Sequence, residues 1–242
     1  MQKRSYLIVT ASIGSGHIKA AEAIGNEIKR KYPAADIRIV DFMSRETAWI
    51  HWLMKKIYLK MLAFVPNLYE FLYKFSGGHA SGGTVQLLFA LVMQRTMAKL
   101  LDHYKPDVLI CTHPFPEGAA SRLKCSGKAD FFFAVVMTDY SVHQIWLYPG
   151  VDRYFVATEK MRQDLLAAGF SADTIQVTGI PIAYREDEQS ARELLLDKFG
   201  LRADIPVLLL MGGGLGLGGV DFALSELEKL SRPLQILVVA GR

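Results

Sequence analysis

Short apolar runs alternate along the chain with longer segments in which apolar residues recur every three or four positions. The short runs have the length of buried strands, and the longer segments have the period of helices. This alternation is typical of a parallel sheet with helices on its faces. We therefore predict a doubly wound, Rossmann-like α/β domain with a long helical insertion after its second strand. The expected strands are 6–10, 37–41, 108–111, 131–137, 154–156 and 175–177, and the expected helices are 18–32, 84–104, 115–124 and 159–168.

The pattern restarts after Pro181. A charged helix is expected at 190–199, a buried strand at 207–211, a helix at about 220–230 and a further strand at 234–240. One strand–helix–strand unit is too small to cover its own sheet. We therefore predict two domains, 1–181 and 182–242, of which the second is the incomplete start of another Rossmann-like domain.

Composition and charge narrow the possible functions. The chain is 51% hydrophobic and 21% charged, as in a folded globular protein, and its net charge of +4 gives no reason to expect a nucleic-acid partner. Two cysteines are too few for a disulfide framework or a thiolate metal site, and Cys111 is expected to be a buried, inert thiol. No apolar run is long enough for a transmembrane helix, so a cytoplasmic protein is expected.

The first strand is followed by a glycine-containing turn, ASIGSGHIKAA, that leads into the first helix. In an open α/β sheet such a turn lies at the carboxyl ends of the strands, where ligands bind. Gly14 and Gly16 permit close approach of a ligand, and Ser15 with the free amides of the helix start favours anionic or hydroxyl groups. His17 stands at the helix start, where the helix dipole is expected to lower its pKa. A neutral imidazole at this edge is suited to be a general base.

Two other interpretations fit the same turn. It can be a tight turn whose histidine only caps the helix, or it can be a dinucleotide-binding fingerprint. Asp41 favours the fingerprint, because it ends the second strand, where an acid that binds ribose would lie. Lys19 argues against it, because a long side chain occupies the position where helix and strand must pack closely.

Two further segments, THPFP and TDYSVH, also follow predicted strands and are expected at the same edge. His113 and His143 are candidates for ligand binding, or structural hydrogen-bonding residues. Asp139 can orient a base, bind a sugar hydroxyl or cap a turn. Trp146 either offers a broad apolar wall beside a ligand or packs in the core.

A second glycine-rich loop, GGGLGLGG, follows the strand at 207–211. Such a loop presents backbone amides to phosphate groups. It is not a P-loop, because no Gly-Lys-Ser/Thr sequence ends it.

Residues 49–75 hold eight aromatic residues, and on a helix up to Val65 the lysines form one narrow polar stripe. Aromatic rings interleaved with lysines suit the headgroup boundary of an anionic bilayer. Alternatively, the wide apolar face covers the domain's own sheet. We expect part of this face to be core, and we predict membrane contact at Trp49, Trp52, Lys55, Lys56 and Lys60.

Six segments occur along nearly the whole chain in one order: GSGHIKAA, VDFMS, THPFP, TDYSVHQIWLYPGVDRYFVATE, TGIPI and MGGGLGLGG. Together they resemble the diacylglycerol glycosyltransferases, the group that contains monogalactosyldiacylglycerol synthases and processive diacylglycerol glucosyltransferases. The resemblance implies a two-domain GT-B fold, with the acceptor lipid in the N-terminal domain and a UDP-hexose mostly in the C-terminal one. It also implies inversion at the anomeric carbon with His17 as the base. No metal and no cofactor are expected, because helix dipoles and basic groups stabilise the leaving diphosphate.

The resemblance also gives the candidate sites their ligands. The acceptor site is expected at Gly14, Ser15, Gly16, His113, Asp139, His143 and Trp146. The donor site is expected at Gly212, Gly213, Gly214 and Gly216.

We therefore expect a hexosyltransferase that acts on diacylglycerol in glycolipid synthesis, peripheral on the inner face of the cell membrane, with anionic membrane lipid as a partner. The C-terminal half that completes the donor site is expected to be missing, so that the chain alone is inactive. Two alternatives remain open: transfer to a polyprenyl-linked acceptor, and a non-catalytic fragment that binds lipid or membrane. The resemblance does not distinguish glucose from galactose.

Overall fold

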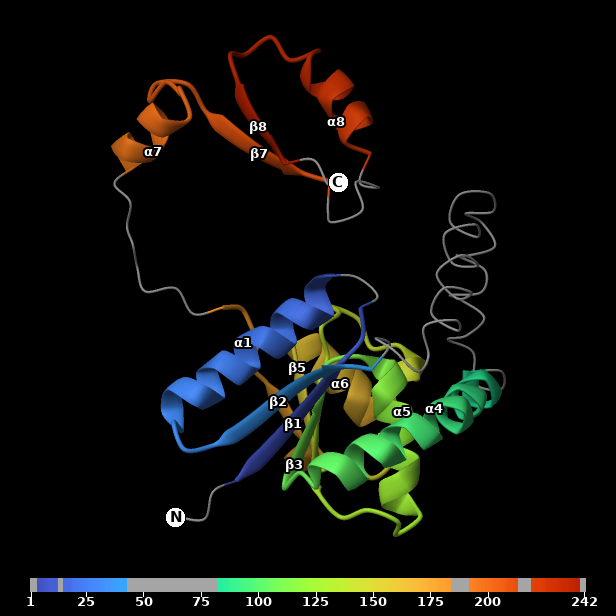
Figure 1. Ribbon diagram of the computed structural model, residues 1–242. Coiled ribbons are helices and arrows are strands. Elements are labelled where there is room, and N and C mark those ends of the chain that lie inside the picture. The colour runs from blue at the N-terminus through green and yellow to red at the C-terminus, as the bar shows by residue number, and fades with distance from the viewer. Residues whose placement is uncertain (1–3, 13–14, 43–81, 184–191, 213–218, 240–242) are drawn as a thin grey trace. The chain divides into compact units, whose positions relative to one another are not determined.

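The computed structural model describes residues 4–12, 15–42, 82–183, 192–212 and 219–239 (Figure 1). Residue contacts divide the chain into two compact units, Met1–Tyr184 and Arg185–Arg242. We refer to them as unit 1 and unit 2 and describe each by itself. The helical insertion predicted after the second strand lies outside the described residues as far as the start of α4 at Gly82.

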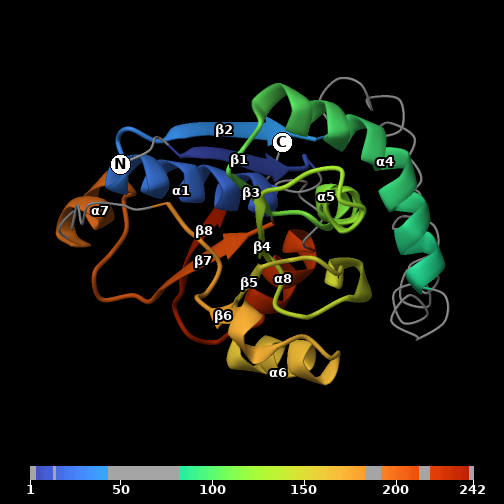
Figure 2. The same ribbon diagram turned by 90° about the horizontal axis from the view of Figure 1, so that it is seen from below.

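Unit 1 is built on a parallel sheet of six strands in the order β2-β1-β3-β4-β5-β6, which Figure 2 shows side by side. The strands are β1 (Ser5–Thr10), β2 (Asp36–Asp41), β3 (Val108–Cys111), β4 (Phe132–Val136), β5 (Arg153–Val156) and β6 (Ile175–Val177). The helices are α1 (Ser15–Lys31), α4 (Gly82–Tyr104), α5 (Pro114–Cys125) and α6 (Glu159–Ala167), with the 3-10 helices η1 (Gln144–Trp146) and η2 (Ala172–Thr174). The predicted doubly wound, parallel α/β fold is confirmed.

Alternate residues of the central strands face two separate hydrophobic clusters, as expected for a sheet covered on both faces. Leu7 and Val9 of β1 belong to the cluster that includes residues of α4, α5 and α6. Ile8, between them, packs with Ala21 of α1 in the other cluster. Figure 1 shows α1 on one side of the sheet and α4 and α5 on the other. This packing holds the carboxyl ends of the strands at one common edge.

A fully buried carboxyl group, that of Glu117 on α5, joins three parts of unit 1. The hydroxyl oxygen of Tyr154 lies 3.2 Å from Glu117 Oε1 and 2.9 Å from the carbonyl oxygen of Tyr148. The backbone amide of Tyr148 donates to the same hydroxyl oxygen at 3.2 Å. The single phenol proton is shared between Glu117 Oε1 and the Tyr148 carbonyl oxygen, so the carboxyl group of Glu117 receives only part of one hydrogen bond from Tyr154. Burial raises the pKa of Glu117 well above its usual range and so favours the neutral form of its carboxyl group.

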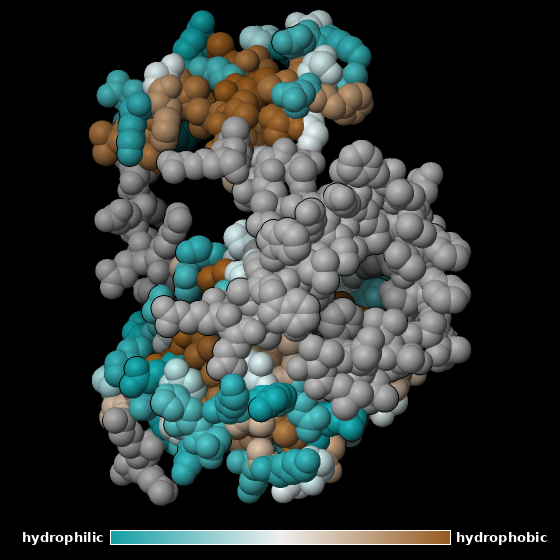
Figure 3. Space-filling view, turned by 45° about the vertical axis from the view of Figure 1, so that its right-hand side comes forward, coloured by the Kyte–Doolittle hydropathy of each residue, from teal (hydrophilic) through white to brown (hydrophobic). Residues whose placement is uncertain are grey.

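Unit 2 holds a parallel pair of strands, β7 (Val207–Met211) and β8 (Gln235–Val239), and the helices α7 (Arg192–Lys198) and α8 (Val220–Leu227). The prediction of a strand at 207–211 is confirmed, but its predicted burial is wrong, since Leu209 is 53% and Met211 64% exposed. A pair of strands with short helices offers too few neighbours to cover both faces of the sheet. Figure 3 shows hydrophobic residues gathered on the surface of this unit.

Candidate active site

The strand order of unit 1 changes direction at β1, because β2 lies on one side of it and β3 on the other. Ligands of open α/β sheets bind at such a switch point, in the crevice outside the carboxyl ends of the strands. β1, β3 and β4 are neighbours there, and the segments that follow them carry His17, His113 and Asp139. The topology therefore brings these candidate residues to one edge of the sheet.

His17 is held by hydrogen bonds to the ends of two neighbouring strands. It belongs to the first turn of α1, which begins at Ser15. Its Nδ1 lies 2.8 Å from the carbonyl oxygen of Thr112, after β3, and 2.5 Å from the hydroxyl oxygen of Thr138, after β4. The Thr112 hydroxyl donates in turn to the backbone carbonyl of His17 at 3.1 Å. The ring is half-buried, so it is fixed in position and still accessible to a ligand.

The pKa of His17 is lowered from its usual value, chiefly because burial disfavours the charged imidazolium. The hydrogen bond to the Thr112 carbonyl and the negative charge of Asp139 act in the opposite direction. The sequence predicts this lowering from the helix dipole, whereas its principal cause in the structure is burial. A lowered pKa keeps the imidazole neutral at physiological pH, which is the state that can accept a proton.

His113 lies against His17 and caps the next helix. The two ring centroids are 4.5 Å apart in an edge-to-face arrangement. His113 is the N-cap of α5, where its Nδ1 accepts the amide of Phe115 at 3.2 Å, and Pro114 follows at the first turn, where it is tolerated. The His113 side chain is 4% exposed, and burial lowers its pKa well below the usual range. His113 is thus a neutral capping residue with little surface left for a ligand.

Asp139 is exposed, and its carboxylate accepts a hydrogen bond from the indole Nε1 of Trp146 at 2.8 Å. Trp146 is fully buried, and its ring centroid lies 6.3 Å from that of His17. A side chain with no exposed surface offers no wall to a ligand in this conformation, so Trp146 takes the core-packing role that the sequence left open. At this edge it anchors Asp139, whose charge raises the pKa of His17.

The remaining acceptor-site candidates contribute less to the cluster. Ser15 and Gly16 are exposed in the first turn of α1, beside His17, and Gly14 lies outside the described residues. His143 is half-buried where η1 begins. Ligand binding by these residues stays a prediction.

Thr112 and Thr138 are residues of the candidate site to which the sequence alone assigns no separate role. Both supply an oxygen to the ring of His17. Their place beside His17 can be predicted from the sequence, because each threonine directly follows the apolar run of a predicted strand, and parallel strands end at the same edge. The contact from Thr112 uses a backbone carbonyl, however, and residue type does not encode such a contact.

The second glycine loop is described only at its ends. Gly212 is buried after β7, and its amide donates to the carbonyl of Val239 at 3.2 Å. That amide belongs to the sheet and is not available to a phosphate group. Gly213, Gly214 and Gly216 lie outside the described residues, so the donor site stays a prediction there.

The predicted membrane contacts also fall outside the described part of the chain. They are Trp49, Trp52, Lys55, Lys56 and Lys60. Within the residues that the structure describes, no helix combines the length and the apolar character needed to cross a membrane. Contact with a bilayer surface therefore remains a prediction from the sequence pattern.

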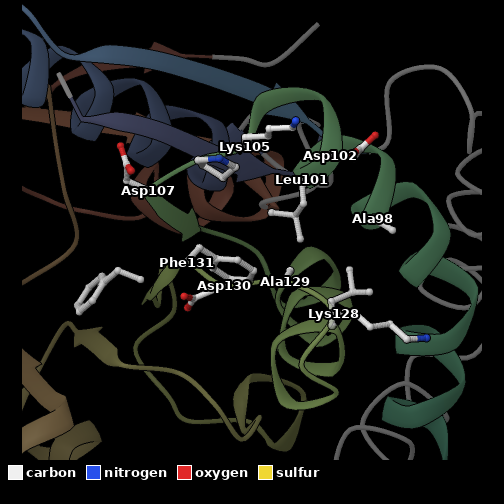
Figure 4. A pocket seen from close by; sticks show the side chains of 12 residues that line it. Ala98, Leu101, Asp102, Lys105, Asp107, Lys128, Ala129, Asp130 and Phe131 are labelled. Atoms are coloured by element: carbon white, nitrogen blue, oxygen red, sulfur yellow. The ribbon is translucent and has the colours of Figure 1, made fainter. Parts of the chain in front are cut away.

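A pocket of about 660 Å³ lies at the opposite edge of the sheet, at the amino ends of β3 and β4. Figure 4 shows Leu101 of α4 and Phe131, just before β4, pointing toward one another across it. Its lining carries charges of both signs, among them Lys105 and Asp130. Its position sets it apart from the candidate active site, and we assign no ligand to it.

The sheet with its ligand edge places unit 1 in the class of Rossmann-like units found in GT-B enzymes. Two similar solved structures are MurG of Acinetobacter baumannii (11% identity, TM-score 0.51, 99% of this chain and 59% of that chain) and a glycosyltransferase of Rickettsia africae (15% identity, TM-score 0.52, 99% and 61%). A UDP-GlcNAc 2-epimerase of Neisseria meningitidis is similar as well (14% identity, TM-score 0.51, 97% and 64%). At such identities the likeness shows the fold alone, which transferases and epimerases share.

The family model of monogalactosyldiacylglycerol (MGDG) synthase matches residues 17–182. Curated relatives include the processive diacylglycerol beta-glucosyltransferases of Staphylococcus haemolyticus, 28% identical over 244 residues, and of Bacillus cereus, 30% identical over 236 residues. These alignments cover 100% and 98% of this chain, but 61% and 60% of the relatives. The chain belongs to the MGDG synthase family, as the resemblance of its motifs predicts, and it spans about 60% of the length of these relatives.

Proposed function

We propose that this chain carries the acceptor-binding part of an inverting glycosyltransferase, which moves a hexosyl group from a UDP-sugar to diacylglycerol. The observation that carries the proposal is the placement of His17. Its half-buried imidazole is bonded to the ends of β3 and β4 at the switch point of the sheet, inside the stretch that the family model matches. Relatives named as diacylglycerol glucosyltransferases support this class of acceptor.

In the proposed reaction, His17 accepts the proton of the free hydroxyl of diacylglycerol while the hydroxyl oxygen attacks the anomeric carbon. The bond from that carbon to the β-phosphate oxygen breaks, and UDP leaves with the electron pair. The product has the inverted configuration, and the proton then passes from His17 to water. Asp139, anchored by Trp146, favours the imidazolium that forms, because its negative charge raises the pKa of His17.

The donor side of the proposal rests on the second glycine loop. We place the diphosphate at the backbone amides of residues 213–219, since Gly212 already uses its amide within the sheet. Backbone amides and helix dipoles stabilise the negative charge of the leaving group. The proposal therefore includes a UDP-hexose as donor substrate and no further cofactor.

The proposal is tested in a chimera that joins this chain to the remaining C-terminal part of the Staphylococcus haemolyticus relative. Labelled UDP-glucose and UDP-galactose are offered with vesicles that contain either diacylglycerol or a polyprenyl phosphate. We expect transfer to diacylglycerol, and about 10²–10⁴-fold slower turnover in His17→Ala with little change in UDP binding.

Glu22→Gln, an exposed change on the same helix, is the control and should keep normal turnover. Undiminished turnover in His17→Ala would refute the assignment of the base. Transfer to the polyprenyl acceptor alone would refute the acceptor.

We also propose that residues 49–60 touch the anionic bilayer that holds the acceptor. Each lysine near such a surface contributes about 1 kcal/mol, so three lysines together change partitioning by roughly two orders of magnitude. Vesicle flotation of the Lys55→Gln, Lys56→Gln, Lys60→Gln triple variant should show release from anionic vesicles, and high salt should have the same effect. Flotation that neither the variant nor salt changes would contradict membrane contact through this segment.

A further inference from the structure

The hydrogen bonds of His17 decide which of its ring nitrogens carries the proton. Two oxygens approach the same nitrogen, Nδ1: the Thr112 carbonyl oxygen at 2.8 Å and the Thr138 hydroxyl oxygen at 2.5 Å. A carbonyl oxygen only accepts hydrogen bonds, so Nδ1 must donate to it. The opposite tautomer would set the lone pairs of Nδ1 and of the carbonyl oxygen against each other at 2.8 Å.

The Thr138 hydroxyl completes a closed set of bonds. Its oxygen takes a share of the Nδ1 proton, and its own proton is directed to the Thr112 carbonyl at 3.4 Å. Thr112 is tied to the histidine a second time, because its hydroxyl donates to the backbone carbonyl of His17 at 3.1 Å. The residues that follow β3 and β4 thus hold both the ring and the backbone of one residue of α1.

We propose that Thr112 and Thr138 are positioning residues that hold His17 as the tautomer with its proton on Nδ1. The lone pair then lies on Nε2, the nitrogen on the far side of the ring from the threonines. Many catalytic histidines are oriented by a carboxylate on Nδ1. Here a backbone carbonyl and a hydroxyl take that place, while the nearby carboxylate of Asp139 bonds to Trp146. The role of Nε2 as the proton acceptor of a transfer reaction rests on the proposed function. The assignment of the tautomer does not depend on it.

His113 serves as an internal reference, because its proton is expected on the other ring nitrogen. Its Nδ1 accepts the backbone amide of Phe115, so the proton of the neutral ring must lie on Nε2. The two rings are in edge-to-face contact, yet their protons are fixed by different partners. Loss of the Thr138 hydroxyl should therefore shift the tautomer ratio of His17 toward the Nε2–H form and leave that of His113 as it is.

The test is NMR spectroscopy of the 242-residue chain with ¹⁵N-labelled histidine, in which long-range couplings identify the protonated ring nitrogen. His17→Gln and His113→Gln assign the two resonances. At a pH where both rings are neutral, we expect the proton on Nδ1 of His17 and on Nε2 of His113. Thr138→Val should lower the ratio of Nδ1–H to Nε2–H forms of His17 about fivefold, because a net hydrogen bond of about 1 kcal/mol corresponds to that factor.

Thr10→Val is the matched control. Thr10 ends β1, is 2% exposed, and its hydroxyl has no hydrogen-bond partner among the described residues. This variant and Thr138→Ser, which keeps the hydroxyl, should both retain the wild-type ratio. The proposal is overturned if wild-type His17 carries its proton on Nε2, or if Thr138→Val changes the ratio no more than Thr10→Val does. These spectra need no substrate, so failure of the transfer assay alone would count against the proposed function and not against the tautomer.

Discussion

The strands of the two units are alike in composition and different in their surroundings. β1 of unit 1 and β7 of unit 2 are both largely apolar. Leu7 and Ile8 have no exposed surface, whereas Leu209 is 53% exposed. The difference lies in the neighbours, since among the described residues unit 1 has six strands with helices on both faces and unit 2 has a pair of strands. An apolar run therefore predicts a strand, but its burial depends on how many other elements cover it.

The largest expected effect compares one apolar side chain from each unit. Phe133→Ala removes a fully buried ring from the core of unit 1 and should lower the free energy of unfolding of this unit by about 3–5 kcal/mol. Leu209→Ala in unit 2 should cost less than about 1 kcal/mol, because its side chain is already half in water. Urea denaturation followed by tryptophan fluorescence reports on unit 1, which holds all three tryptophans, and amide exchange of β7 reports on unit 2. Equal losses from the two variants would remove the contrast between the units.

A smaller effect is expected from a carboxylate of each unit. Asp152 in unit 1 binds Lys124, and it also accepts the amide of Phe133 at 2.6 Å. Asp152→Asn should destabilise unit 1 by about 1.5–3 kcal/mol, since hydrogen bonds to charged groups are stronger than neutral ones. Asp204 in unit 2 pairs only with the exposed Arg202 among the described residues, so Asp204→Asn should leave stability unchanged within error. A loss in Asp204→Asn as large as that in Asp152→Asn would show that unit 2 is more tightly organised than its exposure indicates.

The smallest expected effect, counted per pH unit, depends on pH and belongs to unit 1. The folded-state pKa of Glu117 is raised, so above its usual value of 4.5 the unfolded chain loses the proton first. The stability of unit 1 then falls as pH rises, by up to about 1.4 kcal/mol per pH unit, until the folded pKa is reached. The lowered pKa values of His17 and His113 act in the opposite direction, but only below about their usual 6.5.

Glu117→Gln keeps a neutral hydrogen-bonding group of the same shape and should remove this slope above about pH 7. Denaturation of wild type and variant at a series of pH values measures the difference. Asp107→Asn, at an exposed carboxyl of the same unit, is the control and should keep the slope. If the slope of Glu117→Gln matched that of the wild type, Glu117 would have to be ionised in the folded state.

The sequence predicts the elements of the sheet well, because most of its strands are short apolar runs. The predicted strand at 108–111 coincides with β3, and the helix predicted at 84–104 differs from α4 only at its start. The sequence also predicts the cluster at the sheet edge, because His17, His113 and Asp139 each follow a strand. It does not predict the hydrogen bonds of His17, since a hydrogen bond to a backbone carbonyl depends on how the strands are aligned.

Trp146 and Glu117 show the same limit. Trp146 was predicted to bind the acceptor, and its ring lies 6.3 Å from that of His17, but its full burial follows from the cluster that surrounds it and not from its place in the motif. The buried acid in the core was also not foreseen. Glutamate on a helix ordinarily predicts an exposed face, and only the tertiary contact with Tyr154 shows where its carboxyl group lies.

The buried acid of unit 1 also has a calorimetric consequence. When unit 1 unfolds at a pH between the usual pKa of glutamate and the raised folded-state pKa of Glu117, this carboxyl group reaches water and ionises, and its proton passes to the buffer. The heat absorbed on unfolding then includes the heat with which the buffer takes up that proton. Unfolding enthalpies measured in phosphate and in Tris should therefore differ, because the two buffers bind protons with different heats. The difference between them counts the protons released, and Glu117→Gln should reduce that count by about one.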